Sequence, residues 1–192
     1  MSASREADLA VLAALIRKWN PAINLVAPST LSDLEERHIR DSLQLANLVD
    51  RPPGLWLDIG SGGGLPGLVL AICHRECEIR LVDSDRRKVA FLQTAIRELS
   101  LEKCTAVASR IEDLPPAAAN NLSARALAPL VRLMPYLARH LAQNGTAWLM
   151  KGRNWQAELE TARETWRFDV VVHPSTTDLG SVILAIRDVH HG

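Results

Sequence analysis

The chain has 192 residues, of which 47% are hydrophobic, and its formal net charge is zero. This length suits one domain with at most a small extension, and the hydrophobic fraction excludes wholesale disorder. No apolar run reaches the length of a membrane span, and the N-terminus lacks a signal-peptide layout. Cys73, Cys77 and Cys104 fit no disulfide framework and offer no second cluster of metal ligands. We therefore expect a cytoplasmic protein without a metal site.

Residues 1–50 are predicted to form a helical extension. Apolar residues at helical spacing indicate a helix over 4–19, which Pro21 and the asparagine before it should end. A capping-box pattern favours a second helix over about 31–49. An Arg-Pro-Pro-Gly stretch then separates this extension from the main domain, which we expect over 51–192.

Short apolar runs alternate with helical patterns through the main domain, which predicts an α/β fold with a mostly parallel sheet. The last two strands are predicted to close the sheet as an antiparallel hairpin, unlike the wholly parallel sheet of a dinucleotide-binding fold. Ser84 should cap the helix after the second strand, and a helix broken near Pro135 should end before Gly145. The expected strands span 55–59, 78–82, 103–108, 121–124, 146–150, 168–173 and 181–187.

The first strand leads into a glycine-rich turn, where glycines allow positive φ and let a ligand approach the backbone. The turn fits two cofactor patterns. Gly62-x-Gly64-x-x-Gly67 matches the dinucleotide pattern of a nicotinamide-dependent oxidoreductase. Asp58-x-Gly60-x-Gly62-x-Gly64 is similar to the first motif of S-adenosylmethionine-dependent methyltransferases with a Rossmann-like fold. In that second pattern, which the turn favours, Asp58 would hold the methionine part of the cofactor, directly or through water.

Two further positions follow neighbouring strands and face the same edge of the sheet. Asp83 ends the second strand, where both cofactor classes place an acid that binds two ribose hydroxyls; the alternative is a simple helix cap. The segment containing Ile111 and Glu112 follows the third strand, level with the glycine turn. An apolar side chain there could cover an adenine ring, although a loop without ligand contact fits the spacing equally well.

The charges are unevenly distributed along a chain that is neutral overall. No acidic residue occurs over 114–157, a segment that contains five cations. This asymmetry predicts a basic face for phosphate contacts, although a high arginine content is also what GC-rich coding produces. The cations of the segment are Arg125, Arg132, Arg139, Lys151 and Arg153.

Taken together, these stretches resemble the RsmG (GidB) family of bacterial small-subunit ribosomal RNA methyltransferases. The resemblance covers nearly the whole chain and implies a Rossmann-like class I methyltransferase, with a mostly parallel seven-stranded sheet, a terminal antiparallel hairpin and an N-terminal helical extension. The matching stretches, in the family order, are Asn24–Val26, Arg37–Ser42, Asp58–Gly67, Val82–Ser84, Arg87–Leu92, Ser109–Glu112, Ala124–Ala126 and Leu149–Gly152.

The resemblance also implies an activity: transfer of a methyl group from S-adenosyl-L-methionine to N7 of one guanosine in 16S rRNA. One departure is Ala124, which stands where family members often carry Ser before the arginine, so no role is expected for a hydroxyl there. The resemblance implies that Gly60 and Leu65 contact the cofactor, that Asp83 binds its ribose, and that Ile111 and Glu112 contact its adenine. It also implies that Arg125 reaches the cofactor or the target and that the segment around Lys151 faces RNA.

N7 of guanine carries an exposed lone pair and no proton, so the reaction needs no general base, and none is obvious in the sequence. Direct in-line attack then depends on alignment, for which Arg125, Lys151 and His38 are the positioning candidates. His38 fits equally a structural role beside Asp41 on one helix face.

We expect the substrate to be 16S rRNA within the small ribosomal subunit or an assembly intermediate, because the N7 edge is hidden in the deep groove of A-form RNA. We expect the protein to act as a monomer. Two alternatives remain open. A small-molecule methyltransferase would share every cofactor residue. An NAD-dependent oxidoreductase would need a hydride-handling residue, for which the lone Tyr136 is poorly placed.

Overall fold

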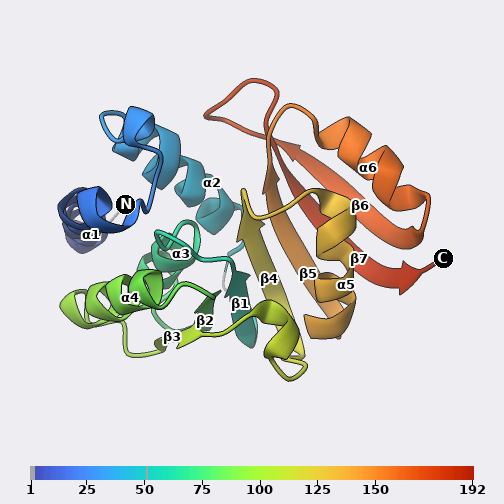
Figure 1. Cartoon of the computed structure of the whole chain (residues 1–192), viewed down its shortest axis with the longest axis horizontal. Coiled ribbons are helices and arrows are strands. Elements are labelled where there is room, and N and C mark those ends of the chain that lie inside the picture. The colour runs from blue at the N-terminus through green and yellow to red at the C-terminus, as the bar shows by residue number, and fades with distance from the viewer. Residues whose placement is uncertain (1–2, 51) are drawn as a thin grey trace.

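In the part of the chain that the structure describes, residues 3–50 and 52–192 of a computed structural model, seven strands form one sheet (Figure 1). Their order is β3-β2-β1-β4-β5-β7-β6. Neighbours among β1 to β5 are parallel, whereas β7 lies between β5 and β6 and is antiparallel to both. This confirms the predicted sheet and its terminal hairpin. The strands are β1 Leu55–Ile59, β2 Glu78–Asp83, β3 Cys104–Ala108, β4 Ala119–Arg125, β5 Leu141–Lys151, β6 Trp166–Pro174 and β7 Val182–His191.

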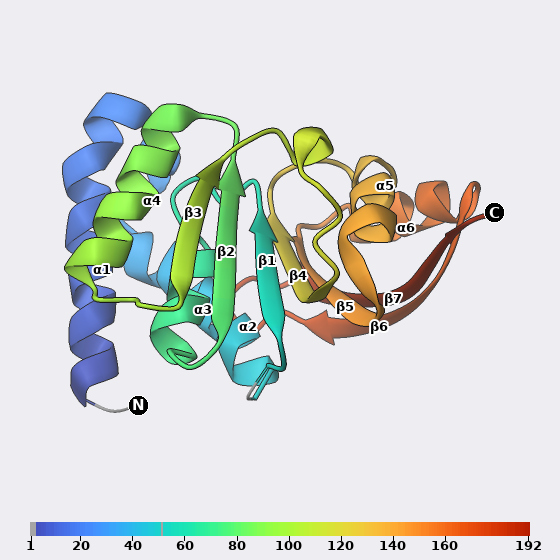
Figure 2. The ribbon, with the colours of Figure 1, turned by 90° about the horizontal axis from the view of Figure 1, so that it is seen from below.

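Helices cover both faces of the sheet. Figures 1 and 2 show α1 to α4 around the β3–β1 half and α5 and α6 beside the β5–β6 half. Among the described residues, no helix is both long and apolar enough to cross a membrane. The helices are α1 Ala3–Ile23, α2 Asp41–Leu48, α3 Gly67–Cys73, α4 Arg86–Glu98, α5 Leu130–His140 and α6 Trp155–Arg163, with short helical segments η1 Pro28–Thr30, η2 Glu35–Arg40 (a π-helix) and η3 Ile111–Asp113.

The two faces of the sheet bury two separate hydrophobic clusters. Side chains of β5 alternate between them, as the pleat of a strand requires. Trp148 and Met150 join the cluster formed with α1 to α4, and Ala147 and Leu149 join the one formed with α5 and α6. Burial on both faces explains why these strands appear in the sequence as continuous apolar runs.

The first helix does not end where its sequence suggests. α1 continues through Pro21 to Ile23. The buried Asn20 closes this last turn: its backbone carbonyl accepts a hydrogen bond from Asn24 N at 2.9 Å, and its side-chain oxygen accepts one from Val26 N at 2.8 Å. These two bonds stabilise the helix end although proline lacks an N–H. Arg51, in the predicted linker, lies outside the described residues.

Two other helices also differ from the predictions. Asp85, and not Ser84, caps α4, because the Asp85 side chain accepts a hydrogen bond from Arg87 N at 2.8 Å. α5 ends at His140, before Gly145 as predicted, but it continues through Pro135 without the expected break. The residue after the helix, Leu141, already pairs with β4.

Candidate functional site

Two cavities open at the carboxyl ends of β1, β2, β4 and β5, the edge where open α/β sheets bind ligands. The larger has a volume of about 870 Å³ and the smaller about 450 Å³. Ala126, Leu127 and Ala128, which follow β4, line both. These three residues therefore form the partition between the two cavities.

Leu127 lies directly on the glycine-rich turn. Gly60 has φ +64°, and a Cβ atom there would lie 2.5 Å from Leu127 Cδ1. The Leu127 side chain nevertheless remains 40% exposed. Gly60 lines the smaller cavity, so a ligand that spans both cavities over Gly60 has to displace Leu127. Sequence patterns gave no signal for this residue, because the contact joins loops far apart in the chain.

The other predicted residues of the turn do not line either cavity. Gly62 N donates a hydrogen bond to Asp83 Oδ2 at 2.8 Å, which ties the turn to β2. A Cβ atom on Gly64 would lie 2.3 Å from Leu68 Cδ1, so this glycine permits close packing of the turn on α3. Leu65 is only 5% exposed and belongs to the hydrophobic core. Contacts of these three residues with a cofactor remain predictions.

Asp58 lies beneath the turn, not on a cavity wall. It is 1% exposed, and Ser123 Oγ donates a hydrogen bond to its Oδ1 at 2.5 Å while accepting one from Trp56 Nε1 at 2.8 Å. Asp58 Oδ2 has no hydrogen-bond partner among the described residues. Burial raises the pKa of Asp58 to about 6. Through Ser123, Asp58 links β1 to β4, and its contact with the cofactor, directly or through water, stays a prediction.

Asp83 lines the smaller cavity with its carboxylate fixed by two backbone amides. Oδ2 accepts from Gly62 N and Oδ1 from Asp85 N, each at 2.8 Å. Each carboxylate oxygen has a second lone pair, so both can still accept from a pair of hydroxyls. The same side chain thus shapes the turn and remains suited to a ribose.

Ile111 and Glu112, in the short helix η3, also line the smaller cavity. Glu112 accepts a hydrogen bond from the hydroxyl of Tyr136, and this bond lowers the pKa of Glu112. Tyr136 also lines the cavity, with Arg132 and Lys88. The sequence did not indicate that these three residues line one cavity, because they come from helices α4 and α5 that the fold alone brings together.

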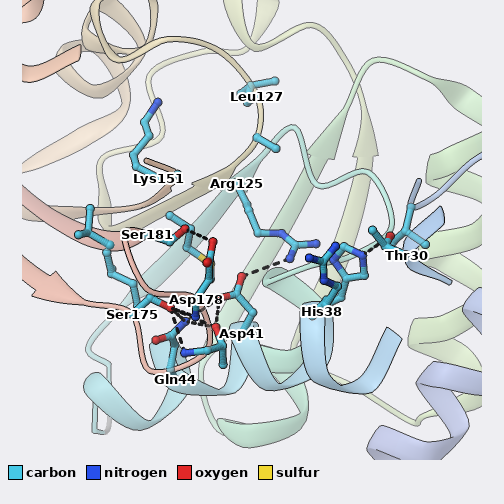
Figure 3. Close-up of a pocket in the computed structure, with 18 of the residues that line it drawn as sticks. Thr30, His38, Asp41, Gln44, Arg125, Leu127, Lys151, Ser175, Asp178 and Ser181 are labelled. Carbon is cyan, nitrogen blue, oxygen red and sulfur yellow. Dashed lines mark hydrogen bonds and ion pairs between the residues drawn. The ribbon is translucent and has the colours of Figure 1, made fainter. Parts of the chain in front are cut away.

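Arg125 and Asp41 form the centre of the larger cavity (Figure 3). Arg125 Nη1 lies 3.4 Å from Asp41 Oδ2, and the two side chains are 17% and 19% exposed. Burial lowers the pKa of Arg125, and the charge of Asp41 opposes that change. A buried guanidinium has five N–H donors, and one long contact leaves capacity for an anionic or carbonyl ligand.

His38 lines the larger cavity, and the hydrogen bond of its side chain is to Thr30 and not to Asp41, the partner that the structural alternative suggested. Its Nε2 lies 2.7 Å from Thr30 Oγ1, and its Nδ1 is buried without a hydrogen-bond partner among the described residues. Burial, followed by the charge of Arg125, lowers the pKa of His38 to about 4. The imidazole is therefore neutral at physiological pH.

Lys151 is held inside the larger cavity. It is 8% exposed, and Nζ donates to Ala128 O and to Glu158 Oε2, both at 2.8 Å. Glu158 Oε2 also accepts from Leu130 N at the start of α5. Lys151 thereby holds the partition loop in place from β5.

The predicted basic face is only partly formed. Arg125 and Lys151 lie within the larger cavity, whereas Arg139, which donates to Leu114 O at 2.9 Å, is exposed. Arg132 and Arg153 are exposed. Among residues 3–50 and 52–192, no group of three or more His, Cys, Asp or Glu side chains is arranged to hold a metal ion.

Hydrogen bonds between α2 and the β6–β7 loop form one wall of the larger cavity. Gln44 Oε1 accepts from Thr176 N at 2.9 Å, and Asp41 Oδ1 accepts from Thr177 Oγ1 at 2.9 Å. Figure 3 shows Gln44 and Asp41 of α2 facing Ser175 of the β6–β7 loop. In the sequence, the only indication of this wall was the run of polar residues 175–178, which follows the expected strand 168–173.

The sheet order, with an antiparallel β7 inserted beside β5, and the cavities over a glycine turn define a Rossmann-like methyltransferase fold. Solved structures agree. A SAM-dependent methyltransferase from Aquifex aeolicus superposes with a TM-score of 0.63 at 15% identity, covering 92% of this chain and 98% of that one. The mitomycin 7-O-methyltransferase MmcR gives a TM-score of 0.66 at 12% identity, covering 97% and 68%.

The chain belongs to the GidB family, whose model is described as rRNA small subunit methyltransferase G and matches residues 5–186. A relative named ribosomal RNA small subunit methyltransferase G from Paracoccus denitrificans is 55% identical over the full length of both chains. Another of that name from Cereibacter sphaeroides is 47% identical, over 100% of this chain and 94% of its own. The family resemblance seen in the sequence is thereby confirmed.

Proposed function

We propose that this protein transfers a methyl group from S-adenosyl-L-methionine to N7 of one guanosine in the 16S rRNA of the small ribosomal subunit. The observation that carries the proposal is the pair of cavities that meet at Leu127 over Gly60, in a chain of this family. One cavity suits an adenosine and the other has room for an incoming base.

The residues of the smaller cavity fit an adenosine. Asp83 presents carboxylate oxygens to the ribose, and Ile111 and Glu112 face the space over the glycine turn. Gly60 leaves the backbone accessible once Leu127 moves. Arg125, beyond the partition, suits the carboxylate of the methionine part or the O6 atom of a guanine. When bound, S-adenosyl-L-methionine supplies an electrophilic methyl group on a sulfonium.

No proton has to leave N7, so this chain has only to orient the base and exclude water. Arg125 can donate hydrogen bonds to the guanine edge, and Lys151 holds the partition loop beside it. His38 is neutral, its pKa is about 4, and its Nε2 already contacts Thr30. It is therefore poorly suited to accept a proton, and a hydrogen bond from His38 to the base would require its ring to leave Thr30 or to turn.

The base must leave its stack to reach a cavity of this kind, so the target guanosine should lie in a loop or be extruded. The small subunit, or an intermediate in its assembly, would present such a loop in a fixed conformation. We propose that one copy of the chain acts on it, since the residues that would hold the cofactor and the base all come from a single chain.

Calorimetry and methyl transfer together test the proposal. S-Adenosylmethionine should bind in calorimetry and NAD should not. The Tyr136 hydroxyl, which an oxidoreductase would need for hydride chemistry, is engaged by Glu112 at the cavity wall. Tritiated methyl groups should then enter the 16S rRNA of small subunits from a strain that lacks this gene. Binding of NAD alone would favour an oxidoreductase. Binding of the methyl donor without transfer to RNA would favour a small-molecule methyltransferase.

A further inference from the structure

One apolar side chain projects into solvent at the edge of the larger cavity. Leu179 is 93% exposed, more than any other large hydrophobic side chain among the described residues. It lies in the β6–β7 loop between Asp178 and Ser181, both of which line the larger cavity. Burying a leucine side chain stabilises a protein, so the exposed position of Leu179 gives up a gain that packing would bring.

The loop that carries Leu179 is held firmly. Ser181 N donates to Asp178 O at 3.1 Å, Ser181 Oγ donates to Asp178 Oδ2 at 2.7 Å, and Ser175 N donates to Ser181 O at 2.9 Å. Bonds from Gln44 and Asp41 anchor the same loop to α2. The loop around Leu179 is therefore held in one conformation by hydrogen bonds.

A cation lies beside the exposed leucine. A Cβ atom on Gly180 would lie 3.3 Å from Arg153 Cγ, so the tip of the loop packs along the Arg153 side chain. Arg153 is 80% exposed, and its contact with Asp178 is only 4.0 Å long. Gly152, the residue before it, lines the larger cavity. The edge of the cavity therefore combines an apolar side chain with a solvent-exposed guanidinium.

We propose that Leu179 acts as a wedge in the RNA: it packs against the base next to the target guanosine, while Arg153 contacts the adjoining phosphate. Apolar side chains inserted between bases unstack them, and arginine both pairs with phosphate and stacks on bases. The pair would hold the guanosine out of its stack and in the larger cavity. This inference rests on the proposed function and adds to it the positioning residue that opens the RNA.

The test compares Leu179→Ser and Leu179→Met with a matched control, Val171→Ser. Val171 is also an exposed aliphatic residue, 59% exposed, but lies in β6 and does not line the larger cavity. Methyl transfer to unmodified small subunits is measured at saturating S-adenosylmethionine. Leu179→Ser should lower kcat/KM by about tenfold, the scale of one lost base contact. Leu179→Met should keep most of the activity, and Val171→Ser all of it.

Affinity for S-adenosylmethionine should be the same in all four proteins, and the melting temperature of both Leu179 variants should equal that of the wild type, because Leu179 contacts neither the core nor the smaller cavity. Arg153→Gln should weaken binding to the subunit and reduce its salt dependence. Equal kcat/KM for Leu179→Ser and Val171→Ser would overturn the wedge while the proposed function stands. Absence of transfer by the wild-type protein would overturn the proposed function and the wedge with it.

Discussion

Asp58 is a buried carboxyl group whose ionisation should change the stability of the protein with pH. Burial raises its pKa from 3.8 to about 6, although the hydrogen bond from Ser123 and the charge of Arg125 oppose the rise. The folded state therefore binds this proton more tightly than the unfolded chain does. Through this group, the free energy of unfolding should fall as the pH rises from about 4 to about 6.

The pKa change from 3.8 to about 6 corresponds to about 3 kcal/mol. His38 acts in the opposite sense in the same pH range. Its pKa is lowered from 6.5 to about 4, so its contribution to stability is lost as the pH falls through that interval. The two effects oppose each other in the wild-type protein, and only a comparison of variants separates them.

Asp58→Asn isolates the carboxyl group, because the amide does not titrate and can still accept the hydrogen bond from Ser123. Urea unfolding of both proteins gives the free energy of unfolding between about pH 4 and 7. The free energy of unfolding of the wild type minus that of the variant should decrease by about 2.4 kcal/mol over this range, because part of the change lies below pH 4. Asp85→Asn is the control, because the pKa of Asp85 is lowered to about 2. The free energy of unfolding of the wild type minus that of Asp85→Asn should therefore stay nearly constant above about pH 5. If the difference in free energy of unfolding between the wild type and Asp58→Asn did not change with pH, the claim that burial raises the pKa of Asp58 would be refuted.

Three further predictions concern the cavities. Leu127→Ala should raise the affinity for S-adenosylmethionine severalfold in calorimetry, because the side chain over Gly60 no longer has to move; unchanged affinity would show that the cofactor avoids this space. Arg125→Gln should lower kcat by at least about tenfold, as loss of a positioned donor does, and wild-type turnover would contradict its role. Single-turnover rates should be flat between about pH 6 and 9, because His38 is already neutral there, and a steep limb would reveal a titrating base.

The sequence predicted the fold and one wall of the site because those depend on local patterns. Alternating apolar runs indicated the sheet, and the glycines and Asp83 followed strands that end at one edge. The Asp41–Arg125 pair joins residues 84 positions apart, so no local pattern could reveal it. The hydrogen bond from Ser123 to Asp58 likewise joins two strands that lie far apart in the sequence, so no local pattern indicated it, and the role of Asp58 towards the cofactor stays a prediction.

Mapping of N7-methylguanosine in 16S rRNA tests the central claim most directly. Small subunits from a strain that lacks this gene are incubated with the purified protein and S-adenosylmethionine, and the rRNA is then reduced mildly and cleaved with aniline. The account predicts one new cleavage site, which requires both the protein and the methyl donor. Methyl groups incorporated at another atom, or no cleavage beyond that in untreated subunits, would contradict it.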